Sequence, residues 1–234
     1  MKAIPLLLLF VTSSLKLWAT AQYPDKLWYK GKEYDMHTNP MEAFFEKHPD
    51  RKPKNGIIST ALWRGYVATF EIKNDQLLLK DIEIKVQDTG KTYQTKWVSV
   101  LKEVFPNQQE INIDWYTGLL VLPHGKLVNY VHMGYGSTYE KYILLEIGAG
   151  KLTQEKKLDY KAFAQFREQQ FEAFRKTDEY KKLKTDLQKN GSGDEFIDDF
   201  LKNFIMDYIK RSYSCVLISL VARACAVARG AVDP

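Results

Sequence analysis

Six residues with aromatic rings or a guanidinium group could form a recognition surface. They occur in three short segments of the chain and are Trp63, Arg64, Tyr66, Trp115, Tyr116 and Tyr135. Tryptophan and tyrosine offer a flat apolar face with a hydrogen-bonding edge, and the planar fork of arginine matches a carboxylate. Such groups suit binding of a protein, peptide or glycan ligand. The competing interpretation is core packing around one internal arginine ion pair.

A hydrolytic site is the alternative chemistry that the side chains permit. Asp114 with Glu71 or Glu83 could form an acid–base pair for glycoside cleavage, which requires two carboxyl groups at a set separation. His132 could complete a cell-envelope hydrolase with Asp114 and Arg64, although a structural histidine is the competing interpretation. A pocket that unites Arg64, Asp114 and His132 would favour the enzyme, and their dispersal would favour a binding module.

Motifs of established catalytic chemistry do not occur in the sequence with their full spacing. The chain has four histidines, at positions 37, 48, 124 and 132, and none forms a His-x-His or His-x-x-x-His pair. Both cysteines, Cys215 and Cys225, lie near the end of the chain, so no local pattern indicates a metal. Gly134 and Gly136 precede a strand-like alternation without a Walker lysine, and serine- and cysteine-nucleophile motifs are lacking. We therefore expect no cofactor and no metal, and we favour a non-enzymatic module.

The positive charge of the chain is concentrated at its two ends. Of the formal charge of +5, Lys2 and Lys16 contribute two, and residues 211–234 contribute two more, which leaves +1 for residues 22–210. Nucleic-acid binding requires clustered lysine and arginine side chains that neutralise phosphates. A body that is almost neutral makes a nucleic-acid partner an unfavourable hypothesis.

Residues 1–21 have the pattern of a secretory signal peptide. Lys2 precedes an apolar run over residues 4–11, and the small residues Ala19 and Ala21 flank Thr20 just before Gln22. The run is too short to span a hydrocarbon core of ~30 Å. We expect a mature chain that begins at Gln22, is periplasmic or extracellular, and has no stable transmembrane span.

Residues 22–158 are expected to form the mainly antiparallel β portion of a single α+β domain. Alternation of period two predicts a hairpin from Leu62 to Val86 that turns at Asn74-Asp75, and a smaller hairpin that turns at Gly31. Further short strands joined by glycine-containing turns indicate an antiparallel sheet of several strands. Two short helices should interrupt it, one capped by Asn39 and one of about ten residues around residues 97–105.

Residues 159–211 are expected to add a C-terminal set of about three helices to the same domain. Asp159 should cap the first helix, and Thr177 or Asp178 should begin the second. The third begins with the capping-box pattern of Ser192 and Glu195. It has a broad apolar face that consists of Phe196, Ile197, Phe200, Leu201, Phe204, Ile205, Tyr208 and Ile209.

The segment over residues 212–234 is an atypical tail, apolar and rich in arginine. It contains both cysteines of the chain and a single acidic residue, Asp233. An in-frame extension and a membrane-associated segment are two interpretations, and Arg223, which follows a short apolar stretch, disfavours the second. We expect the tail to add nothing to the fold of the body.

Three segments resemble parts of small exported proteins of unknown function from Bacteroidota-type bacteria. The segments are residues 29–34, 62–72 and 131–136, and the resemblance spans roughly residues 23–210. It implies export and carries no activity, fold or catalytic residue. The sequence therefore predicts an exported α+β binding or interaction module of unidentified ligand, with the hydrolase as the alternative.

Overall fold

The computed structural model describes residues 21–90, 94–132, 134–203 and 205–208. Residues 1–20 of the predicted signal peptide and the atypical tail over 212–234 lie outside the described residues. The strands are β1 (Asp25–Tyr29), β2 (Lys32–Met36), β3 (Val67–Lys73), β4 (Gln76–Gln87), β5 (Thr95–Ser99), β6 (Ile111–Asn112), β7 (Gly118–Asn129), β8 (Thr138–Gly148) and β9 (Lys151–Asp159). The helices are α1 (Pro40–Lys47), the 3-10 helix η1 (Pro49–Arg51), α2 (Leu101–Val104), α3 (Tyr160–Phe174), α4 (Asp178–Lys189), α5 (Asp194–Asn203) and α6 (Ile205–Tyr208).

These strands form one sheet in an α+β fold, and the sheet is mixed. Its order is β2-β1-β3-β4-β9-β8-β7, with β5 and β6 also paired to β4. Most neighbours are antiparallel, but β1 and β3 are parallel, which corrects the prediction of an antiparallel sheet. The chain turns back from β1 through the antiparallel strand β2, and residues 37–66, which contain α1 and η1, then join the end of β2 to the start of β3 on the other side of β1. Helices therefore occur in both halves of the chain and are not only C-terminal.

The two predicted hairpin turns are confirmed. Lys30 and Gly31 between β1 and β2, and Asn74 and Asp75 between β3 and β4, all have positive φ. Two successive residues of positive φ are typical of the tight turn whose twist matches that of paired strands. The turn residues alone thus determine where these strands reverse.

The predicted helix around residues 97–105 is wrong over its first half. Trp97 lies in β5 opposite Lys85 of β4, and only the four residues of α2 are helical. Helical spacing of apolar residues indicates a helix when no neighbouring strand is available to form hydrogen bonds with the backbone. Here the second half of the long strand β4 offers a hydrogen-bonding edge, and pairing with it extends to Ser99.

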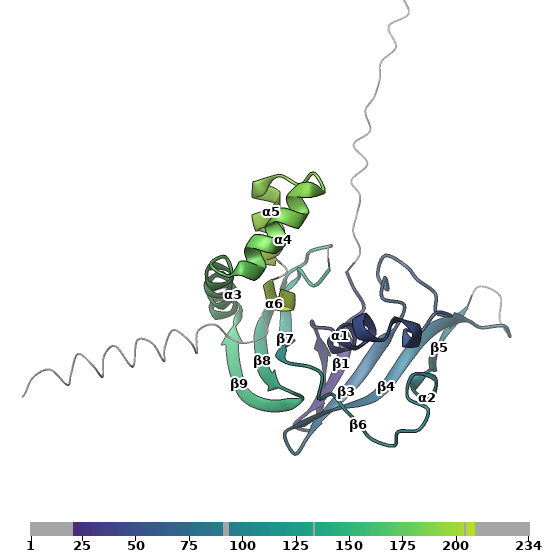
Figure 1. The fold of residues 1–234 in the computed structure, drawn as a ribbon. Coiled ribbons are helices and arrows are strands. Elements are labelled where there is room, and N and C mark those ends of the chain that lie inside the picture. Colours follow the sequence, from purple (N-terminus) through teal and green to yellow (C-terminus); the bar gives the residue numbers. More distant parts are fainter. Residues whose placement is uncertain (1–20, 91–93, 133, 204, 209–234) are drawn as a thin grey trace, which may run out of the picture.

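Two apolar clusters lie on opposite faces of β7 and β8. Leu120 and Leu122 belong to the cluster shared with β1–β4 and α1, whereas Leu119 and Val121 belong to the cluster under the C-terminal helices. Figure 1 shows α3, α4 and α5 grouped beside β7–β9 and away from β3–β5. A strand covered on both faces needs a continuous apolar run, which explains the uninterrupted burial of residues 118–123.

The first two C-terminal helices, α3 and α4, begin where their capping residues predict, whereas α5 begins at Asp194 rather than directly after Ser192. The Asp159 carboxylate accepts a hydrogen bond from Ala162 N at 2.8 Å, and the Thr177 hydroxyl accepts one from Tyr180 N at 3.2 Å. Only part of the expected apolar face of α5 is covered, since Phe196 is 62% exposed whereas Leu201 is fully buried. None of the helices among the described residues combines the length and apolarity needed to cross a membrane.

Candidate functional site

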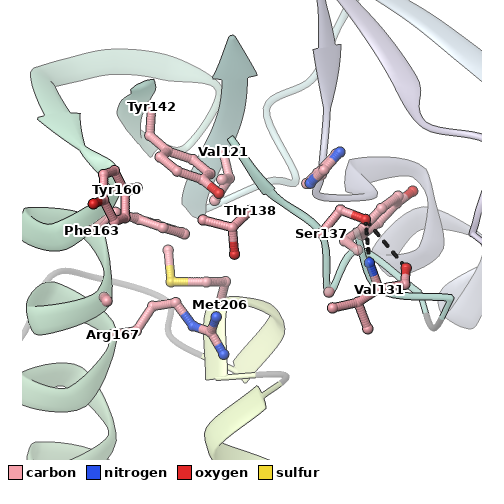
Figure 2. A pocket seen from close by; sticks show the side chains of 13 residues that line it. Val121, Val131, Ser137, Thr138, Tyr142, Tyr160, Phe163, Arg167 and Met206 are labelled. Carbon is pink, nitrogen blue, oxygen red and sulfur yellow. Dashed lines mark hydrogen bonds between the residues drawn. The ribbon is translucent and has the colours of Figure 1, made fainter. Parts of the chain in front are cut away.

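A cavity of about 220 Å³ lies between α3, α6 and the segment that joins β7 to β8 (Figure 2). One wall is apolar, because the rings of Tyr142 and Phe163 stack at 3.9 Å with an interplanar angle of 19°. Val121 of β7 and Met206 of α6 extend this wall. The apolar stripe of α3 must pack on the outer face of β8, and the Asp159 cap sets where that helix begins.

Arg167 brings a positive charge to the cavity. It lies four residues after Phe163 and four before Phe171, so it shares the stripe by which α3 packs on the rest of the protein. One of its terminal nitrogens, Nη2, donates a hydrogen bond to the carbonyl of Lys202 at 3.2 Å. Burial lowers the pKa of Arg167, since desolvation disfavours the charged form. A guanidinium nonetheless remains protonated at neutral pH, so the cavity wall is cationic.

His37 and Tyr135 form a second wall, with ring centroids 4.5 Å apart and an interplanar angle of 12°. His37 directly follows β2, and its backbone N–H donates to the carbonyl of Val121 at 2.8 Å. Burial lowers the pKa of His37 to about 4, because desolvation disfavours the imidazolium. The ring is therefore neutral at pH 7 and acts as an aromatic, polar surface.

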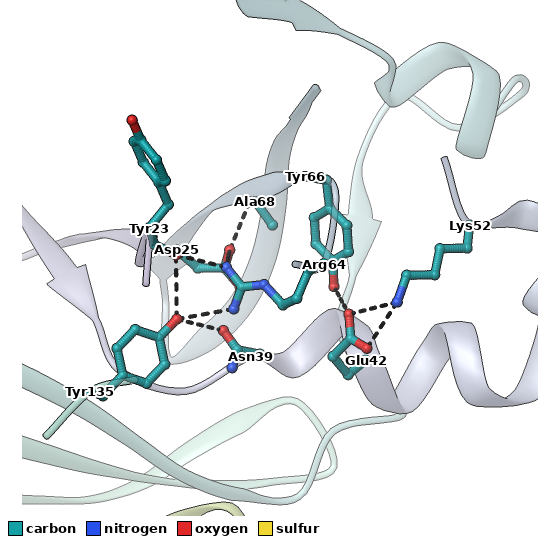
Figure 3. Close-up of polar contacts among 9 residues, drawn as sticks. All are labelled: Tyr23, Asp25, Asn39, Glu42, Lys52, Arg64, Tyr66, Ala68 and Tyr135. Atoms are coloured by element: carbon teal, nitrogen blue, oxygen red, sulfur yellow. Dashed lines mark hydrogen bonds and ion pairs between the residues drawn. The ribbon is translucent and has the colours of Figure 1, made fainter. Parts of the chain in front are cut away.

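The Tyr135 hydroxyl connects this wall to a buried polar cluster (Figure 3). It accepts a hydrogen bond from Arg64 Nη1 at 3.0 Å and lies 3.0 Å from the Asn39 side-chain oxygen, to which it can donate. Asn39 makes no side-chain capping bond to α1, which differs from the sequence expectation. The tertiary partner Tyr135 uses the oxygen that a local cap would have required.

Arg64 and Asp25 form the centre of that cluster. Arg64 Nη2 lies 3.0 Å from Asp25 Oδ1, and the two side chains are 3% and 0% exposed. Asp25 Oδ1 also accepts from Ala68 N at 2.9 Å, whereas Oδ2 has no hydrogen-bond partner among the described residues. Burial raises the pKa of Asp25 to about 6, against the opposing effect of Arg64. Removal of one member of such a pair typically costs about 3–5 kcal/mol, because it leaves a buried charge uncompensated.

The predicted binding residues are only partly brought together. Arg64 and Tyr135 meet, as described, and Arg64 forms the internal ion pair that was the competing interpretation. Tyr66 is fully buried, and its hydroxyl donates to Glu42 at 2.6 Å. Of the six predicted residues, Tyr135 lines the cavity and the others do not. Trp63 is 54% exposed, and Trp115 and Tyr116 are half-buried.

Asp114 and His132, the residues of the hydrolase alternative, are not brought together. Asp114 is exposed and precedes β7, whereas His132 is exposed and follows it. A strand of 12 residues has a path of about 40 Å, so the two side chains lie at opposite ends of it. Glu71 pairs instead with Lys80 at 3.1 Å. His132 packs edge-on against Tyr130, with ring centroids 4.4 Å apart.

Sequence reasoning missed Arg167 and His37. Arg167 had a detectable signal, since a charged residue in the centre of an apolar helical stripe must either find a buried partner or face a cavity. His37 had none, because its stacking partner Tyr135 is 98 residues away and only the tertiary fold brings the rings together. In the part of the chain that the structure describes, no group of three or more metal-ligating side chains occurs.

Comparisons of the chain with protein-family models, with curated proteins and with solved structures found no match.

Proposed function

We propose that the protein is an exported binding module that holds a ligand group in the cavity between α3, α6 and the β7–β8 segment. The cavity itself carries the proposal. Ligand sites are typically concave, mostly apolar and supplied with a few convergent polar groups. Here Val121, Phe163 and Met206 provide apolar surface, and Arg167 and Thr138 provide polar groups.

The size of the cavity supports a compact ligand group. An apolar protein cavity of ~150 Å³ is large enough to bind benzene. A volume of about 220 Å³ therefore accommodates one aromatic ring together with a short polar substituent. This is smaller than the ~300–1,000 Å³ of sites for drug-sized molecules, which favours a small molecule or a single side group of a larger one.

The hydrogen bonds that fix the residues of the cavity walls favour binding to a preorganised site. Tyr135 is linked through Arg64 to the buried Asp25, and His37 is fixed by its backbone bond to β7. When the side chains that line a site are already ordered, ligand binding does not have to order them, so its entropic cost is smaller. The separation of Asp114 from His132 favours this binding role over hydrolysis.

A cavity-filling substitution tests the proposal. Ala164 lines the cavity, whereas Gln169, on the same helix, is exposed and does not line it. We expect ligand-observed NMR with a panel of one-ring fragments, neutral, cationic and anionic, to detect binding to the protein. Ala164→Phe should abolish this binding, and the matched control Gln169→Phe should retain it. Binding of no fragment of any charge, or equal binding by Ala164→Phe, would contradict the proposed function.

A further inference from the structure

We propose that the cavity binds a phenol, that is, an aromatic ring that carries a hydroxyl group, and that the imidazole of His37 forms a hydrogen bond with this hydroxyl. The inference rests on the proposed function and specifies its ligand class. It follows from the contacts of the His37 ring, from the aromatic side chains on two sides of the cavity and from the size of the space between them.

The ring of His37 is held in place at the cavity, yet its nitrogens are not paired within the described part of the chain. Tyr135 stacks on the ring with centroids 4.5 Å apart, and Tyr139 lies edge-on at 5.7 Å. The backbone bond to Val121 fixes the residue itself. Among the described residues, neither imidazole nitrogen has a hydrogen-bond partner, and the side chain lines the cavity. A ligand in the cavity can therefore meet a ring nitrogen that the protein leaves unpaired.

The neutral imidazole of His37 selects for a hydroxyl group. Burial lowers its pKa to about 4, so at neutral pH the ring has one N–H donor and one nitrogen acceptor. A hydroxyl both donates and accepts, so it can pair with whichever nitrogen faces the cavity. A ligand that excludes water without offering such a group would leave the nitrogen unpaired, which costs free energy.

Aromatic side chains on two sides of the cavity favour a ring as the remainder of the ligand. The stacked Tyr142 and Phe163 form one wall, and His37 with Tyr135 forms another. Aromatic rings attract one another through their quadrupoles in addition to the area that they bury. A volume of about 220 Å³ holds one ring with its hydroxyl. The Thr138 hydroxyl also faces this space (Figure 2) and makes no hydrogen bond to a described residue, so it offers the ligand a second polar contact.

Calorimetry with matched probes tests the inference on the purified protein. The probes are p-cresol and toluene, which differ only by the hydroxyl group. We expect the wild type to bind p-cresol about two- to tenfold more tightly, as the net gain from one hydrogen bond predicts. His37→Phe keeps a ring that can stack on Tyr135 and removes both nitrogens, so it should bind toluene at least as tightly as p-cresol. His48→Phe, at an exposed residue that does not line the cavity, should retain the preference of the wild type.

Nitrogen NMR of the histidine rings gives a second readout, which needs no substitution in the cavity. A hydrogen bond to an imidazole nitrogen changes its chemical shift. We expect p-cresol to shift the ring-nitrogen signals of His37 in the wild type and toluene to leave them nearly unchanged. The signals of His48 and His124, which do not line the cavity, should not respond to either probe.

The phenol group occurs both in free phenols and in the side chain of tyrosine, and two capped tripeptides distinguish these sources. They have tyrosine or phenylalanine between two glycines. Tighter binding of the tyrosine peptide than of p-cresol, with weaker binding of the phenylalanine peptide, identifies a tyrosine side chain as the source. Tighter binding of p-cresol than of either peptide identifies a free phenol.

The outcomes separate this inference from the proposed function. Equal or tighter binding of toluene by the wild type, or a preference for p-cresol that persists in His37→Phe, overturns the inference and leaves the binding module standing. Binding of p-cresol without a change in the His37 nitrogen signals does the same. If His37→Phe binds neither probe, these signals in the wild type decide. Failure of both probes to bind the wild type overturns the inference, and failure of the whole fragment panel overturns the proposed function as well.

Discussion

Tyr135 belongs to both the cavity and the buried ion pair. Its ring stacks on His37, and its hydroxyl is hydrogen-bonded to Arg64 and to Asn39. All three of these residues lie in the segment over residues 37–66 that joins β2 to β3, whereas Tyr135 itself comes from the β7–β8 segment. The hydrogen bonds of one hydroxyl group therefore connect the cavity wall to the first half of the chain.

Substitution of Tyr135 by phenylalanine tests that link. We expect Tyr135→Phe to lower the free energy of unfolding by about 1–3 kcal/mol, because it leaves the buried Arg64 and the half-buried Asn39 without this hydrogen bond while the ring is kept. Urea denaturation measures the change. Tyr130→Phe, at a residue that is 51% exposed, is the matched control and should change stability by less than about 0.5 kcal/mol. Equal effects in the two variants would contradict the structural role of the hydroxyl.

The lowered pKa of His37 gives a pH dependence with a defined sign. The pKa is about 4 in the folded protein against an ordinary value of 6.5, so the unfolded chain binds the proton more tightly. Stability from this residue is present above pH 6.5 and is lost as the pH falls toward 4. The raised pKa of Asp25 acts oppositely, since its contribution is present below pH 3.8 and is lost as the pH rises through about 6.

Comparison of the wild type with His37→Asn isolates the histidine, because the Asp25 contribution is common to both proteins. When the pH is lowered from 7 to 4, we expect the wild type to lose about 2–3 kcal/mol more unfolding free energy than His37→Asn. The variant has no imidazole to protonate, so acid destabilises it less. Urea denaturation at the two pH values measures it. A difference that stays constant with pH would show that His37 is not desolvated in the folded protein.

At the scale of elements, α5 packs through fewer residues than its pattern indicates. Ile197 and Leu201 are fully buried in the cluster with Phe171 and Phe174, whereas Phe200 is only partly buried and Phe196 is 62% exposed. The apolar face of α5 is wider than the surface that covers it, so the side chains at its margin remain in contact with solvent. Docking of α5 and of the adjacent α6 also determines where Met206 meets the cavity.

Two alanine substitutions distinguish the centre of that face from its margin. We expect Leu201→Ala to cost about 2–5 kcal/mol through lost burial and a residual cavity. Phe196→Ala should cost less than about 1 kcal/mol, although it removes the larger side chain, because most of that side chain is already in water. Urea unfolding of both variants measures the costs. A larger loss in Phe196→Ala would mean that α5 packs through its other side.

At the scale of the whole molecule, the body from Gln22 to α6 contains both apolar clusters, and both consist of described residues. Each cluster joins elements distant in the chain, as when α3, α5 and α6 cover β7 and β8. We infer that this body folds without the tail over residues 212–234, whose composition differs from it.

Truncation after Tyr213 tests this inference. We expect the melting temperature to remain within a few degrees of that of the full chain, because terminal segments that bury little surface contribute little to global stability. Thermal melts of both proteins under reducing conditions measure the change. A large decrease would show that tail residues such as Leu217 and Val221 are buried on the body, at ~1.5–3 kcal/mol for each buried side chain.

What the sequence alone determined is local. Two consecutive residues of positive φ specify the turns at Gly31 and Asn74, and the side chains of Asp159 and Thr177 specify where helices begin. Each of these features depends on atoms within a few residues, so its pattern is visible in the chain. The α+β class follows from the same patterns, because strands predominate before residue 159 and helices after it.

Only the tertiary structure decided the features that join distant segments. The parallel pairing of β1 with β3, the strand at Trp97 and the loss of the Asn39 cap each result from a partner that lies far along the chain. The cavity is the clearest case, since His37, Tyr135 and Arg167 come from three separate segments. Local propensity is weak compared with the free energy of burying apolar surface and pairing buried polar groups, so such contacts override it.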